Sequence, residues 1–256
     1  MDRIENIDYC IRYLLEQNHA RAEMPRKLQR KKELLRALMN IWRPQLLDVE
    51  FLQAQDAELQ AQRAEKGTVS MRDIAGPGYG PFLWQGDITR LKVDAIVNAA
   101  NARGLGCWHP LHACIDNAIH SAAGLQLRQE CDRILQGQTI ATGGAIITPG
   151  YNLPAKWVIH TVGPIIDADV PTSGQEEMLA GCYRSCLYLA KEHGCRSIAF
   201  CCISTGEFHF PNRRAAEIAV QTVRHQLSII HPPIKVVFNV FKDIDYDIYR
   251  ELLAKN

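Results

Sequence analysis

The sequence lacks the features that mark membrane, secreted and repeat proteins. Its apolar stretches all fall short of the ~18 residues that a membrane-spanning helix needs. Its first residues, MDRIEN, are charged and do not resemble a secretory leader. The chain also contains no internal repeat and no low-complexity tract. We therefore expect a cytoplasmic protein that does not enter the membrane.

A surplus of charge of one sign is also missing. The chain has 29 Lys and Arg residues against 28 Asp and Glu residues, which leaves a net charge of +1. Such a balance provides no basic field with which to hold long nucleic acid. If the ligand is an anion, we expect local backbone amides to bind it.

The nine cysteines do not have the pattern of a disulfide framework. Their number is odd, they are spread over 256 residues, and Cys201 and Cys202 are adjacent within an apolar run. Disulfide-rich secreted domains are short and usually have an even number of cysteines. The pattern therefore favours reduced thiols.

Two regions differ in the period of their apolar residues. Residues 1–70 are rich in charged side chains and have a helical period, which predicts a helical N-terminal extension. It includes a basic cluster, Arg26, Lys27 and Arg30 to Lys32, that fits either a solvated helix face or an acidic partner. Residues 71–82, which contain GPGYGP, predict a connection to a second domain at 83–256.

The second domain alternates strands with helices, which predicts an α/β fold with a sheet between two helical layers. The expected strands are 95–97, 145–148, 157–162, 197–203 and 235–240, with a further strand ending at Gln85. The expected helices are 115–123, 126–135, 175–193, 213–230 and 243–254. A polar loop that leaves a buried strand and enters a helix, as residues 98–115 do, is where such folds bind anions.

That loop contains three side chains that bind metals well. Cys107, His112 and Cys114 follow the spacing Cys-x4-His-x-Cys, and two thiolates with an imidazole favour Zn²⁺. Three protein ligands leave a fourth position open, as in catalytic zinc sites. His109 offers an alternative, a closed structural site, although Pro110 pushes it toward extended geometry. A pair of reduced thiols without metal is the third interpretation.

Five ordered segments resemble the macrodomain, a module that binds ADP-ribose. They are GDIT at 86–89, VDAIVNAAN at 93–101, AIH at 118–120, HTVGP at 160–164 and STGEF at 204–208. Where common macrodomains have a glycine-rich loop, residues 106–116 read GCWHPLHACID, which is similar to the zinc-dependent branch of the family. Members of that branch also have a helical N-terminal extension and remove ADP-ribose from protein carboxylates.

The resemblance implies a three-layer α/β/α fold with a mixed central sheet. It also implies a zinc-dependent hydrolase whose partners are ADP-ribose and a protein mono-ADP-ribosylated on Asp or Glu. Two other functions remain open. One is a non-catalytic ADP-ribose reader with structural zinc, and the other is a hydrolase of small ADP-ribose esters.

Positions at the expected strand ends and helix start, together with the resemblance, predict roles in binding ADP-ribose. Asp87 and the Ile88 backbone would contact adenine, and Phe241 would stack on it. Asn101 would orient the distal ribose, with Asp116 as base or aligning residue. The diphosphate would lie against two turns, formed by Cys114, Ile115, Asp116 and Asn117 and by Ser204, Thr205, Gly206, Glu207 and Phe208.

Several of these residues also have ordinary structural explanations. Asp87 can cap a turn through Thr89, Asn101 can form a turn, and Phe241 can belong to the core. The turn at 204–208 can be tight without binding any ligand.

Two histidines are expected in the interior. His120 could pair with Asp116 one helical turn away, but we expect it to pack, as its counterpart does in related domains. His160 lies in an apolar strand, where we expect its ring to be a satisfied core residue.

Overall fold

The central element is a six-stranded mixed sheet, seen in a computed structural model that describes residues 2–168 and 170–255. The strands lie in the order β2 (Phe82–Gln85), β8 (Lys235–Val240), β7 (Ser197–Phe200), β4 (Ala95–Ala99), β6 (Trp157–Thr161) and β5 (Ala145–Pro149). Neighbours from β2 to β6 are parallel, and β5 runs antiparallel to β6. The sheet is mixed, as expected.

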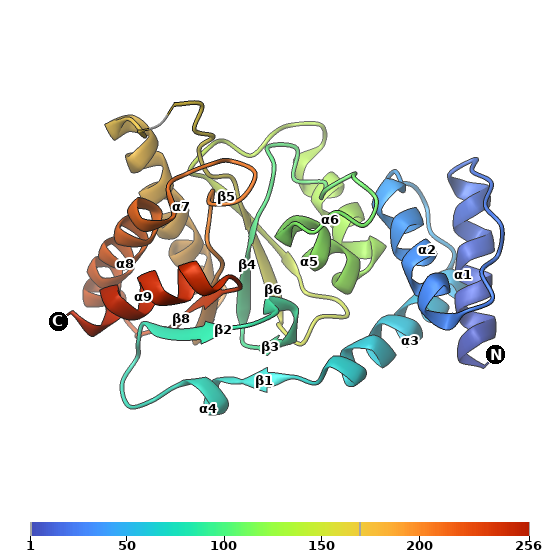
Figure 1. Ribbon diagram of the computed structural model, residues 1–256, viewed down its shortest axis with the longest axis horizontal. Helices are drawn as coiled ribbons and strands as arrows, with labels where there is room; N and C mark the ends of the chain where they lie inside the picture. Colours follow the sequence, from blue (N-terminus) through green and yellow to red (C-terminus); the bar gives the residue numbers. More distant parts are fainter. Residues whose placement is uncertain (1, 169, 256) are drawn as a thin grey trace.

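Helices cover both faces of the sheet (Figure 1). One face carries α5 (Ile115–Ala123) and α6 (Leu125–Leu135), and the other carries α7 (Ser173–Glu192), α8 (Asn212–Ile229) and α9 (Asp243–Ala254). The inner strands are apolar because both of their faces are buried, and Ala95, Ile96 and Val97 of β4 are fully inaccessible. The α/β/α prediction is confirmed.

Residues before the sheet form a separate helical unit beside α5 and α6 (Figure 1). It consists of α1 (Arg3–Gln17), α2 (Leu28–Ile41) and α3 (Val49–Lys66) around a core that includes Trp42 and Phe51. Leu125 of α6 joins this core, so the unit is docked on the sheet domain through apolar contacts. An N-terminal helical region is thus present, as the sequence predicts.

The basic cluster of this unit is largely paired within the chain. Lys31 forms an ion pair with Asp8 and is 6% exposed, Lys32 pairs with Glu65, and Arg30 pairs with Glu33. Lys31 is therefore buried rather than solvated, and the pairing of Arg30, Lys31 and Lys32 within the chain leaves less unpaired charge for an acidic partner.

The segment between the two regions is more ordered than its composition suggests. It contains β1 (Val69–Ser70) and the short helix α4 (Met71–Ile74). Strand β1 pairs in parallel with β3 (Leu91–Lys92), which follows the 3₁₀ turn η1 (Ile88–Arg90). Such two-residue strands have no detectable period in sequence.

The largest error in a predicted strand end is at β7, whereas β4, β5 and β6 end within two residues of the prediction. We expected β7 to extend from 197 to 203, but it ends at Phe200. Beyond Phe200 the chain continues as a loop, in which Ser204 has a left-handed backbone with φ of 65°. Cys201 is therefore buried just beyond the strand, at the start of a functional loop.

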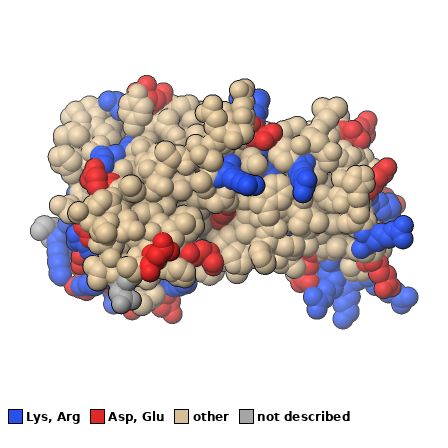
Figure 2. All heavy atoms as spheres, turned by 90° about the horizontal axis from the view of Figure 1, so that it is seen from above, with Lys and Arg blue, Asp and Glu red and all other residues tan. Residues whose placement is uncertain are grey.

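All nine cysteines are free thiols. Among the described residues, no helix is both long and apolar enough to cross a membrane. Figure 2 shows basic and acidic side chains mixed around large uncharged areas, in line with the balanced composition.

Candidate active site

The loops that follow β2, β4, β7 and β8 leave the same edge of the sheet, because these strands are parallel. The longest of them joins β4 to α5 and contains the predicted metal ligands. Its backbone is left-handed at Gly104 and Gly106, with φ of 65° and 78°. A Cβ at Gly106 would lie 2.8 Å from the His120 ring, so this glycine allows the loop to pass close over α5.

The predicted ligands Cys107, His112 and Cys114 come together in this loop. Their donor atoms all lie within 4.8 Å of one another, and Cys107 Sγ is 3.6 Å from His112 Nδ1. Zn–S and Zn–N bonds of about 2.3 and 2.1 Å in a tetrahedron place such donors about 3.5 Å apart. The donor set therefore fits one zinc ion in both chemistry and spacing.

His109, the fourth ligand of the closed alternative, is exposed and lies outside this group. Its ring centroid is 5.8 Å from that of His112. Its carbonyl instead accepts hydrogen bonds from the Asn117 side chain and from the His112 amide. The His109 carbonyl therefore helps to hold the loop together through hydrogen bonds, and the His109 ring is not part of the group of metal-binding donors.

Glu207 contributes to this site from the loop between β7 and α8. Its Oε1 is 3.6 Å from His112 Nε2, the nitrogen opposite to the one facing Cys107. A carboxylate at the far nitrogen is the usual way in which a metal-binding histidine is oriented. Sequence reasoning assigned Glu207 to the diphosphate and did not detect this contact.

Cys114 also begins helix α5. Its Sγ accepts a hydrogen bond from the Asn117 amide at 3.4 Å, and burial raises the pKa of its thiol to about 12. The first turn leaves the Ile115 and Asp116 amides without an intrahelical acceptor. These two amides are the donors that the helix start can offer to an anion.

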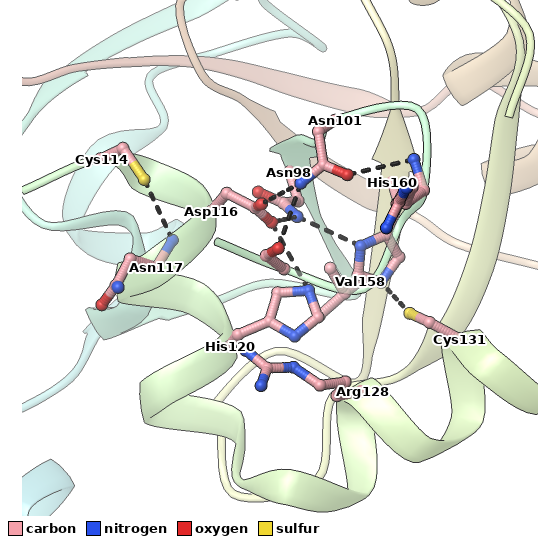
Figure 3. A network of polar contacts seen from close by, with 12 residues as sticks. Asn98, Asn101, Cys114, Asp116, Asn117, His120, Arg128, Cys131, Val158 and His160 are labelled. Atoms are coloured by element: carbon pink, nitrogen blue, oxygen red, sulfur yellow. Dashed lines mark hydrogen bonds and ion pairs between the residues drawn. The ribbon is translucent and has the colours of Figure 1, made fainter. Parts of the chain in front are cut away.

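The two predicted catalytic residues are hydrogen-bonded to each other (Figure 3). Asn101 Nδ2 donates to Asp116 Oδ2 at 3.3 Å and to the Gly106 carbonyl at 3.1 Å. Asn98 Nδ2 donates to the other oxygen, Asp116 Oδ1, at 2.7 Å. Burial raises the pKa of Asp116 to about 6. The carboxylate is therefore held rigidly by two amides at the entrance to α5.

Behind Asp116 lies a second group, His120, Cys131 and His160, with the spacing of a metal site (Figure 3). All three are buried, and burial lowers the pKa of His160 to about 3 and that of His120 well below its usual value. Both ring nitrogens of His160 already have polar neighbours, Asn98 at Nδ1 and Thr148 at Nε2. Cys131 was not singled out by sequence, since the group joins two helices and a strand.

Asp87 follows β2 and caps η1. Its Oδ1 accepts hydrogen bonds from the Thr89 amide and hydroxyl, so Asp87 caps this turn through Thr89, as the structural explanation of this residue predicts. Its Oδ2 forms an ion pair with Lys66 of α3 at 3.0 Å. Burial acts to raise the pKa of Asp87, but the Thr89 hydrogen bonds and the Lys66 charge outweigh it and lower the pKa. The following Ile88 is buried.

The turn at 204–208 combines a buried start with an exposed tip. The Ser204 hydroxyl is buried without a partner among the described residues, whereas Gly206 and Glu207 are exposed. Thr205 donates to the Cys202 carbonyl, and Phe208 packs on the small apolar cluster of Val162. A Cβ at Gly206 would meet no atom within 4 Å, so space is open above this turn.

Phe241 follows β8 at the same sheet edge and is 76% exposed. The core explanation of this residue is therefore wrong. An exposed aromatic ring beside a ligand-binding edge is available for stacking.

These features define an α/β/α domain with its polar site at the carboxyl ends of parallel strands. Residues 97–219 match the Macro domain family. A protein-ADP-ribose hydrolase of Treponema medium is 48% identical, and the alignment covers 99% of this chain and 100% of that protein. A protein of the same name from Staphylococcus aureus strain MSSA476 is 45% identical over 100% of this chain and 99% of its own. The chain belongs to the macrodomain family.

Solved structures agree with this assignment. The Trypanosoma brucei macrodomain in complex with ADP-ribose has a TM-score of 0.66 and 31% identity, covering 84% of this chain and 94% of that one. The Oceanobacillus iheyensis macrodomain with ADP has a TM-score of 0.62 and 38% identity, covering 71% and 95%.

Proposed function

We propose that this protein is a zinc-dependent hydrolase that removes ADP-ribose from mono-ADP-ribosylated Asp or Glu side chains of proteins. The observation that carries the proposal is the convergence of Cys107, His112 and Cys114 next to the hydrogen-bonded pair of Asn101 and Asp116. Whole-length relatives named protein-ADP-ribose hydrolase support the substrate class.

The bond to be cleaved joins C1″ of the distal ribose to a carboxylate oxygen of the modified protein. Addition of water yields free ADP-ribose and the free carboxylic acid. Zinc held by Cys107, His112 and Cys114 would supply a Lewis acid beside this bond. Asn101 would hold the distal ribose, and Asp116 would align it or accept a proton.

The remaining sequence-predicted residues would bind the rest of ADP-ribose. Asp87 and Ile88 would contact adenine, Phe241 would stack on it, and the turn at 204–208 would bind the diphosphate together with the start of α5. The exposed Phe241 ring and the open space above Gly206 support this arrangement.

A second candidate is a non-catalytic ADP-ribose reader in which zinc is structural. The observation in its favour is that Cys114 Sγ caps α5, so a metal here would also fasten the helix start. A hydrolase of small ADP-ribose esters would use the same site with a different leaving group.

Metal removal tests the proposal. We expect the purified protein to contain about one zinc ion per chain, as a mononuclear site requires. Chelation should abolish hydrolysis of a protein mono-ADP-ribosylated on Glu, and added Zn²⁺ should restore it. Zinc content is measured by atomic absorption, and hydrolysis by release of ADP-ribose. A metal-free protein with full activity would contradict the mechanism.

The turn at 204–208 is tested by Gly206→Glu, with Gly206→Ala as the matched control. A Cβ at this exposed position meets no atom within 4 Å, so we expect neither variant to change the melting temperature or the zinc content. The carboxylate should repel the diphosphate and weaken ADP-ribose binding by about tenfold or more, on the scale of one close like-charge contact. Calorimetry should show near wild-type affinity for the alanine variant. Equal affinities for both variants would mean that the diphosphate lies elsewhere.

A further inference from the structure

Helix α2 of the N-terminal unit contacts the metal-binding loop directly. Arg36 donates from Nε and Nη2 to Asn117 Oδ1, at 3.1 and 2.7 Å, and from Nη2 to the His112 carbonyl at 3.4 Å. One turn later, Asn40 Oδ1 accepts from the Leu111 amide at 3.0 Å. Two side chains of α2 therefore reach the segment that lies between the two cysteine ligands.

Asn117 connects Arg36 to the rest of the loop, because it forms hydrogen bonds with both. Its side chain is fully buried, and its Nδ2 donates to the His109 carbonyl at 2.9 Å. Its amide donates to Cys114 Sγ at 3.4 Å. Because Arg36 holds the Asn117 oxygen with two bonds, the side-chain amide is fixed in the orientation that aims Nδ2 at the loop.

A further contact between the two regions involves Arg128 of α6. Its guanidinium lies 4.4 Å from the ring centroid of Trp108, the neighbour of Cys107. The same side chain donates to three carbonyls at the end of α2, those of Met39, Asn40 and Trp42. The buried Arg128 side chain thus contacts both the end of α2 and Trp108, the residue that follows the first ligand of the loop.

We propose that Arg36 and Asn40 are positioning residues that hold the 107–114 loop in the geometry that binds metal. The N-terminal helices are then part of the catalytic unit rather than an appendage for recognising the substrate protein. The inference rests on the proposed function, because it assigns these contacts to the zinc site. Groups that orient metal ligands from outside typically contribute 10- to 100-fold to metal affinity or activity.

Arg36→Met tests the proposal, with Arg30→Met on the same helix as the matched control. Arg36 is half-buried, so methionine can keep the packing of its aliphatic stem and remove only the hydrogen bonds. Arg30 is exposed, and its partner among the described residues is Glu33 of its own helix. We expect Arg36→Met to lose zinc to a chelator about 10- to 100-fold more readily. ADP-ribose affinity should fall by a smaller factor than zinc affinity, because Asp87, Phe241 and the turn at 204–208 do not contact Arg36.

Arg36→Lys provides a rescue test. Lysine retains the charge but not the planar fork that bonds Asn117 twice, so its zinc affinity should fall between those of wild type and Arg36→Met. A general loss of stability would instead lower the melting temperature and the ADP-ribose affinity together. Wild-type zinc affinity in Arg36→Met would overturn the proposal.

Hydrogen exchange separates this proposal from the proposed function. In the zinc-free protein, Arg36→Met should speed amide exchange in peptides covering 107–117, because the loop loses its anchors on His112 and Asn117. Asn40→Ala should speed exchange at Leu111 in the same way. Unchanged exchange would overturn the role of α2 whether or not zinc is catalytic. A wild-type protein that binds no zinc would overturn the proposed function. In that case hydrogen exchange would still show whether Arg36 and Asn40 hold the loop.

Discussion

Cys107→Ala is expected to reduce single-turnover hydrolysis of a protein ADP-ribosylated on Glu by about a thousandfold or more. Loss of a Lewis acid removes several kcal/mol of transition-state stabilisation, and each factor of ten in rate corresponds to about 1.4 kcal/mol. ADP-ribose affinity should fall by less than about threefold, since Asp87, Phe241 and the turn at 204–208 are untouched. Rapid-quench kinetics and calorimetry on the same preparation measure the two quantities.

The matched control is Cys195→Ala, which removes a buried thiol just before β7, at the opposite end of the parallel strands from the metal-binding loop. It should lower the melting temperature slightly and leave the zinc content and the rate unchanged. If zinc is structural, Cys107→Ala should instead lower the melting temperature, the affinity and the rate together as the loop loosens. Proportional loss of binding and turnover would contradict a catalytic role for the metal.

Local sequence patterns predicted most of the fold. Helices 115–123 and 243–254 have the predicted bounds, because each has a clear apolar period and a polar start. The end of β7 and the strand β1 were missed. Strand β7 pairs with β4 over only two registered residue pairs, and the apolar run beyond Phe200 is buried by a loop rather than by a sheet. An apolar run indicates that its residues are buried, but buried residues can lie in a loop as well as in a strand.

The site was predictable where its chemistry is local. Cys107, His112 and Cys114 occupy one short loop, so spacing alone could indicate a shared ligand. The contact of Glu207 with His112 and those of Arg36 with Asn117 join elements that are far apart in the chain. No period or spacing encodes such contacts, because they depend on how the layers pack. The same holds for Phe241, whose exposure only the folded structure shows.

Asn101 and Asp116 are expected to act as one unit, and a double-mutant cycle can show it. Asp116→Asn should lower the single-turnover rate by about 10²- to 10⁴-fold, the range that a positioned acid or base contributes. Asn101→Ala should lower the rate by a smaller factor, because it removes one bond to Asp116 and the contact proposed for the distal ribose. Affinity for ADP-ribose should stay within a fewfold of wild type in both variants.

The double variant decides whether the two residues cooperate. If Asn101 works through the position of Asp116, adding Asn101→Ala to Asp116→Asn should cost little further rate. Thr148→Val is the control for damage to the buried polar network, since Thr148 bonds His160, which in turn bonds Asn98 next to Asp116. This variant removes the Thr148 contact from His160 Nε2, which keeps only the longer contact with Cys131 Sγ at 3.7 Å, and it should destabilise the protein by about 1–3 kcal/mol without a change in rate. Fully multiplicative losses in the double variant would show that Asn101 and Asp116 act independently. A slow Thr148→Val enzyme would show that damage to the buried network is enough to lower the rate, so that the loss in Asp116→Asn is not evidence of a direct catalytic role.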